Sequence, residues 1–174
     1  MDFELNGVVS VDELTILGVT FDARCGWSSH FDKVVKNASR RLYALRLLRS
    51  TLNKKQLIIV YNSLLRSILE YCGPLFLGMS EKDRHRLDGL QKRFHRLLCG
   101  RSCKEDCLES LNDRRCNTSL KFLEKIKEDH VLNEILPQIS KTGRFILPNR
   151  RTERRSRSYI PIACELSNTT RFNR

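Results

Sequence analysis

The apolar residues near the start of the chain are spaced as in β-strands, and the spacing then changes to that of helices. The segment "TILGVTF" (residues 15–21) is a short apolar run. Upstream of it, Asn6–Gly7 is a dipeptide that favours a tight hairpin turn, because both positions tolerate positive φ. We therefore predict a small β-hairpin within residues 3–21, followed by a polar break over Asp22–Gly26.

Farther along, apolar residues recur every three or four positions, which is the period of an amphipathic helix. This period predicts three helices, over residues 29–49, 53–72 and 80–100. The first and third begin with a Ser-x-x-Asp sequence, at Ser29 and Ser80, that resembles a capping box. Glycine residues follow the second helix and end the third, as helix stop signals do.

The helical signal weakens in the C-terminal part of the chain. We predict a short turn or helix over 104–111 and a longer helix over 117–136. The tail contains glycine, proline and the run "RRTERRSRS", for which we expect extended or disordered backbone. The predicted fold class is thus mainly α, with a β-hairpin in residues 1–22, a helical bundle in 23–140 and a basic tail in 141–174.

Charge is distributed unevenly along the 174 residues, whose net charge is +12. Residues 1–32 hold six acids and one base, residues 33–69 hold nine bases and no acid, and residues 141–174 hold nine bases and two acids. Basic stretches without acids suit a polyanion, most simply nucleic acid, although solvated helix surface gives the same pattern. No apolar stretch is long enough to span a bilayer and no secretory signal is present, so no membrane partner is expected.

The basic residues of the first and third predicted helices are interleaved with the apolar stripes of those helices. Packing the stripes inward turns many of these bases toward solvent. The predicted nucleic-acid-binding residues are Lys33, Lys36, Arg40, Arg41, Arg46, Arg49, Lys92, Arg93 and Arg96.

The seven cysteines are an odd number, which favours reduced thiols and a cytoplasmic or nuclear location over a disulfide framework. A zinc site can be imagined around His95, Cys99, Cys103, Cys107 and Cys116. However, no C-x-x-C pair occurs, and structural zinc sites usually pair cysteines two to four residues apart. We predict no bound metal and no other cofactor.

Patterns of catalytic residues are missing from the sequence as well. The four histidines have no recognisable partner pattern, no Asp-Asp pair occurs, and there is no glycine-rich phosphate loop. We therefore predict that the chain is not an enzyme by itself.

Several ordered motifs resemble a known family. The stretch "LGVTFDARCGWSSHFDKVVKNASRRLYALRLLRS" resembles the region that follows the palm in reverse transcriptases of non-LTR (LINE-type) retrotransposons. "YNSLLRSILEYCGPLFLG" and the terminal "RRTERRSRSYIPIACELSN" are similar to later segments of that family, so the likeness covers about residues 8–168. Asn37 departs from it, standing where lysine is usual. The matching positions in the first stretch are Leu17, Gly18, Val19, Asp22, Trp27, Ser28, His30, Leu42, Leu45 and Arg46.

The resemblance implies the thumb and C-terminal extension of such a polymerase, without its catalytic palm and endonuclease. Residues 17–21 would be the last strand of the palm, and the Mg²⁺-binding aspartates would belong to that missing palm. The implied partners are RNA or RNA–DNA duplex, bound through the backbone without sequence specificity, and a palm-bearing polypeptide. The alternative is a helical protein-interaction module without nucleic-acid function. A small nucleic-acid enzyme is a weaker hypothesis, because its acidic residues would form a recognisable pattern.

Overall fold

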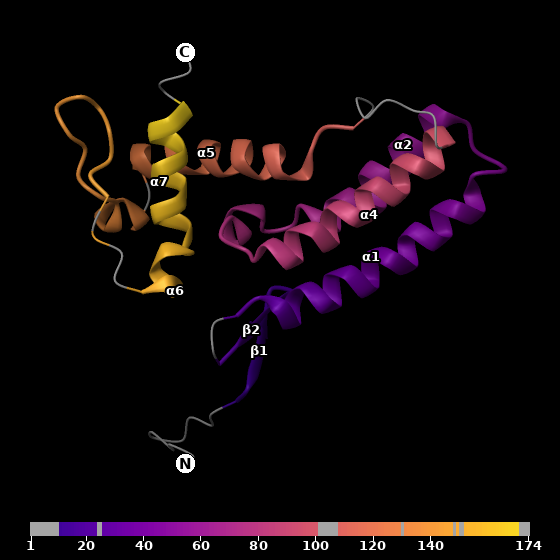
Figure 1. The fold of residues 1–174 in the computed structure, drawn as a ribbon, viewed down its shortest axis with the longest axis horizontal. Helices are drawn as coiled ribbons and strands as arrows, with labels where there is room; N and C mark the ends of the chain where they lie inside the picture. The colour runs from indigo at the N-terminus through magenta and orange to yellow at the C-terminus, as the bar shows by residue number, and fades with distance from the viewer. Residues whose placement is uncertain are drawn as a thin grey trace.

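The computed structural model describes residues 11–23, 26–100, 108–129, 131–147, 149 and 152–170. It confirms a mainly helical protein with a small N-terminal β-hairpin (Figure 1). The elements are β1 (Glu13–Ile16), β2 (Val19–Asp22), α1 (Ser28–Leu48), α2 (Lys54–Tyr61), the π-helical turn η1 (Asn62–Arg66), α3 (Ser67–Leu69), the 3-10 turn η2 (Gly73–Phe76), α4 (Glu81–Cys99), α5 (Leu111–Asp129), the 3-10 turn η5 (Val131–Ile135), α6 (Glu153–Ser156) and α7 (Tyr159–Thr170).

The hairpin turns at a different place from the one predicted. Its two-residue loop is Leu17–Gly18, with φ of 48° and 80°, and Ile16 pairs with Val19 across it. The apolar run 15–21 is therefore two strands and a turn, because Gly18 accepts a positive φ without steric cost. The Tyr71 hydroxyl donates a hydrogen bond of 2.7 Å to the Leu17 carbonyl and holds the turn in place. Asn6–Gly7 lies outside the described residues.

His30 attaches the hairpin to the helices. The Thr20 backbone N–H of β2 donates to His30 Nδ1 at 3.3 Å, and the imidazole stacks on the Phe76 ring with centroids 4.8 Å apart. His30 is buried, and this burial lowers the pKa of its imidazole below the ordinary value of 6.5; the positive charge of Lys33 lowers it further. The contact therefore requires neutral imidazole, since only an unprotonated Nδ1 can accept the Thr20 hydrogen.

We expect the free energy of unfolding to fall as the pH drops from about 7 to 5. Below pH 6.5, His30 is protonated in the unfolded state but stays neutral in the folded state, because its pKa is lowered there. Acid therefore favours unfolding. Urea titrations at a series of pH values would measure this. In the variant His30→Asn, whose amide oxygen can still accept from Thr20, that part of the pH dependence should vanish; an unchanged dependence would contradict the assignment.

The start of α1 corrects the first predicted capping box. Trp27 precedes the helix and makes no side-chain capping bond. The Ser29 hydroxyl instead donates to the Glu13 carboxylate of β1, and Asp32 pairs with Arg86 of α4 at 2.6 Å. Both candidate cap residues are thus used for tertiary contacts, which the sequence spacing does not show.

The second predicted helix begins where expected but is not uniform. Asn53 and Gln56 form a reciprocal capping box at the start of α2. The π-helical turn η1 then widens the helix, and the carbonyl of Leu64 in that turn accepts a 2.7 Å hydrogen bond from Arg41 of α1. The helix ends before Cys72, which has a positive φ of 52°.

The third predicted helix is confirmed as α4, with Ser80 accepting from the Asp83 N–H and Gly100 as its C-cap.

The C-terminal part of the chain contains more helix than the sequence indicated. α5 begins six residues before the predicted start, because the Ser110 hydroxyl accepts from the Asn112 N–H and caps it. The first half of the predicted turn over 104–111 lies outside the described residues. The expectation of an extended tail does not hold over α7, whose buried Ala163 and Cys164 pack in one cluster with Leu123 of α5. An apolar segment covered by another helix is stable as a helix even beside a basic run.

A second, larger core lies between α1, α2 and α4. The rings of Tyr61 in α2 and Phe94 in α4 are stacked, with centroids 4.0 Å apart and an angle of 6° between their planes. α1 and α4 run side by side in the same direction (Figure 1). Asp32 of α1 meets Arg86 near the start of α4, so the C-terminal turns of the two helices also lie near each other.

Candidate nucleic-acid interface

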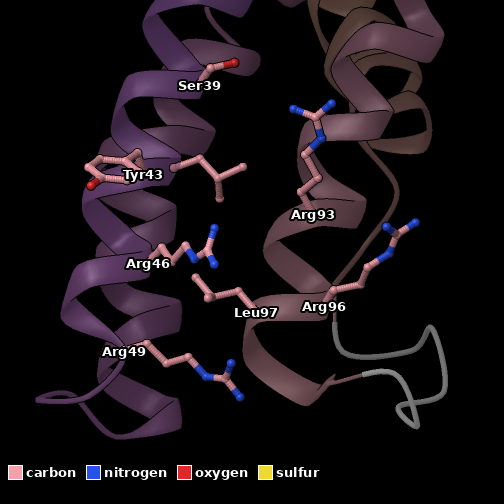
Figure 2. A pocket seen from close by; sticks show the side chains of 8 residues that line it. Ser39, Tyr43, Arg46, Arg49, Arg93, Arg96 and Leu97 are labelled. Carbon is pink, nitrogen blue, oxygen red and sulfur yellow. The ribbon is translucent and has the colours of Figure 1, made fainter.

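An open groove of about 410 Å³ lies between the C-terminal halves of α1 and α4. Leu42 and Leu97, both half-buried, form its apolar floor. Arginines from both helices line the same groove (Figure 2). The lining residues are Ser39, Leu42, Tyr43, Arg46, Arg49, Arg93, Arg96 and Leu97.

Helical spacing explains why these side chains share one groove. On α1, Ser39, Leu42 and Arg46 follow one another at intervals of three or four and so lie on one side of the helix, beside its buried stripe of Phe31, Ala38 and Leu45. Arg49 continues this spacing as the C-cap of the helix, and Tyr43 is the chain neighbour of Leu42. In α4, Arg93 and Leu97 are likewise four residues apart and flank the buried Phe94. The parallel direction of the two helices places both sets at the same level.

The four groove arginines, Arg46, Arg49, Arg93 and Arg96, concentrate positive charge. No carboxylate lines the groove within the described residues, and there the four side chains have no hydrogen-bond or ion-pair partner. Arg86 gives the contrast, since at the other end of the same helix pair it contacts both Asp32 and Asp83.

The ends of the two helices stabilise part of this charge. Arg46 lies in the last turn of α1 and Arg96 in the last turn of α4, where the helix dipole is negative. Such an interaction is worth about 0.3–1 kcal/mol for each exposed charge. It makes a cluster of arginines tolerable without a carboxylate partner, and it leaves the guanidinium N–H groups free to donate.

The remaining predicted binding residues are divided between two environments. Lys33 contacts the hairpin, at 3.0 Å from the Glu13 carboxylate and 3.2 Å from the Thr20 hydroxyl, and Arg41 donates to the Leu64 carbonyl. These two side chains therefore make contacts within the fold. Lys36, Arg40 and Lys92 are exposed and lie outside the groove.

Four groove residues, Ser39, Leu42, Tyr43 and Leu97, were not among the predicted binding residues, because they carry no charge. Leu42 and Leu97 belong to the apolar stripes of their helices, and sequence periodicity assigns such residues to the core. Tyr43 is 63% exposed. The only sequence signal for Tyr43 as a binding residue was its position as an aromatic residue three places before Arg46.

The structure describes only some of the residues that could be imagined around a zinc ion. Cys99 lies near the end of α4 and Cys116 on α5, whereas Cys103 and Cys107 lie outside the described residues. Over the described ranges, no three His, Cys, Asp or Glu side chains are grouped so that they could hold a metal ion.

None of the described helices is both long enough and apolar enough to cross a bilayer.

Comparison with protein-family models, with curated proteins and with solved structures found no match to this chain.

Proposed function

We propose that this chain is a non-catalytic fragment of a LINE-type reverse transcriptase, a thumb-like module that binds the backbone of RNA or RNA–DNA duplex. The observation that carries the proposal is the convergence of Arg46, Arg49, Arg93 and Arg96 in one groove without a described acidic neighbour. The sequence resemblance supports the thumb assignment. It also places the catalytic aspartates in a separate palm, which a palm-bearing polypeptide would supply.

Arginine is well suited to this task. Its planar guanidinium donates two parallel hydrogen bonds to the oxygens of one phosphate, and it stays charged at every physiological pH. Phosphate contacts fix a protein on a duplex but carry no sequence information. The groove should therefore bind unrelated duplexes about equally well.

A protein-interaction module is the second candidate, and the hairpin favours it. Leu14, Ile16 and Leu17 are at least half exposed, and Leu17 reaches 85%. Apolar side chains gathered on one small hairpin are typical of a surface that binds another protein. Binding of that kind would depend little on salt, whereas phosphate binding depends on it steeply.

The test is a titration of the full chain with labelled RNA and RNA–DNA duplexes of two unrelated sequences, followed by fluorescence anisotropy. If about four phosphates are engaged, the logarithm of the association constant should fall with a slope of roughly −3 to −4 against the logarithm of the salt concentration. From 50 to 200 mM salt this amounts to about a hundredfold loss of affinity. Undetectable binding at 50 mM salt, or a slope near zero, would favour the interaction module.

A further inference from the structure

The floor of the groove is apolar, which phosphate binding does not require. Leu42 and Leu97 line the groove together with the arginines. Arg46 points into the space between the helices beside Leu97 (Figure 2). Phosphate oxygens gain nothing from a leucine surface. The groove volume of about 410 Å³ falls within the range of pockets that hold a single small molecule.

We propose that this groove holds one unpaired nucleotide next to the bound duplex, with its base on Leu42 and Leu97 and its phosphates against the arginines. The inference rests on the proposed function and adds a single-stranded element to it. Bases inside a duplex are stacked on one another and hide their faces, so a duplex alone cannot cover the leucine floor. An unpaired base exposes a flat apolar face that can cover this floor.

The groove arginines can contact both the base and the phosphate of such a nucleotide. A guanidinium plane stacks on a base face and its N–H groups also donate to phosphate, so neighbouring arginines can hold both parts of one nucleotide. Tyr43 projects from the outer side of α1 beside Arg46, where its exposed ring can stack with the next base along the strand (Figure 2). Stacking of this kind accepts any base, which agrees with binding that ignores sequence.

Three ligands test the proposal on the full chain: a blunt RNA duplex, the same duplex with a three-nucleotide single-stranded extension, and that duplex with an abasic extension. The abasic extension keeps the added phosphates but lacks the bases. We expect the normal extension to raise affinity about tenfold over the blunt duplex, and the abasic one to raise it less than about threefold. An arm with a DNA extension shows whether the ribose 2′-hydroxyl contributes.

A pair of variants locates the effect. Leu42→Asn makes the floor polar, whereas Leu47→Asn makes the same change on the same helix at a position that is 62% exposed and outside the groove. The first variant should lose the gain from the extension; the second should keep both this gain and the affinity for the blunt duplex. If Leu42→Asn fails to fold, the comparison of normal and abasic extensions on the unmodified chain still decides.

The outcomes distinguish a failure of this inference from a failure of the proposed function. Equal affinity for blunt and extended duplexes, or equal gains from normal and abasic extensions, would overturn the nucleotide site and leave duplex binding intact. Loss of the gain in both leucine variants would overturn the placement of the base on Leu42. Failure to bind any of the three ligands at low salt would overturn both proposals together.

Discussion

Replacing Arg46, Arg49, Arg93 and Arg96 together with glutamine should reduce duplex affinity about a hundredfold at 50 mM salt and bring the salt slope close to zero. Each phosphate contact that is lost removes about one unit from the slope, because the counterion formerly displaced from the nucleic acid is no longer released. The four side chains are at the surface and have no described partner, so the fold should tolerate the change. Anisotropy titrations at several salt concentrations measure both quantities.

The matched control removes the same number of charges elsewhere. Glutamine at four exposed lysines outside the groove also lowers the net charge from +12 to +8, since four positive charges are lost in either variant. This control should keep most of the affinity and most of the slope. If both variants lose affinity equally, binding depends on overall charge and the groove is not the site. The control positions are Lys82, Lys121, Lys125 and Lys141.

The substitution Phe94→Ala should lower the free energy of unfolding by about 3–5 kcal/mol. Phe94 is fully buried and its ring stacks on Tyr61, so the change removes core contacts between α4 and α2 and leaves a cavity. This is a large part of the 5–15 kcal/mol that holds a typical domain together. Urea unfolding followed by circular dichroism would measure the loss.

Tyr61→Phe is the control for this prediction, because it keeps the ring stack and removes only the hydroxyl. That hydroxyl is buried without a hydrogen-bond partner in the described part of the chain, and its burial raises the pKa of Tyr61 to about 12. Removing an unsatisfied buried hydroxyl should leave stability unchanged or raise it slightly. A loss of several kcal/mol in this variant would show that the hydroxyl has a partner.

The position of α7 affects how the basic tail is tested. The segment 150–157 is rich in arginine and could bind polyanions by itself. Shortening the chain near Gly143 would remove it but would also uncover Leu123, which packs in one cluster with Ala163 and Cys164. Point substitutions at Arg155 and Arg157, which are both exposed, test the tail without exposing that core.

The Glu70 carboxylate connects the turn η1 with the helix α5. It lies 2.7 Å from Arg66 Nε in η1 and 2.6 Å from Arg114 Nε in α5. Burial opposes ionisation of Glu70, but hydrogen bonds from Arg114 and Arg66 outweigh this effect and lower its pKa. Forty-four residues separate Glu70 from Arg114, so no local pattern in the sequence predicts the pair.

The amino-acid sequence by itself determined the features that depend on near neighbours in the chain. Ser80 caps its helix as predicted, Asn53 caps the helix that was predicted to begin at that residue, and the apolar stripes of α1, α2 and α4 form the main core. These features follow from contacts within about four residues and from the burial of apolar surface, and both are visible in the order of residue types.

Tertiary structure alone decided which lysine and arginine side chains have no partner within the described fold and which of them lie together. Lys33 and Arg41 share the helical pattern of Lys36 and Arg40, yet the hairpin and the turn η1 engage the first pair and leave the second exposed. Packing also turned Ser29 toward Glu13 and folded α7 onto α5. It brought Arg46 and Arg49 beside Arg93 and Arg96, nearly fifty residues away, because two helices that pack in parallel place their last turns together whatever the distance between them in the chain.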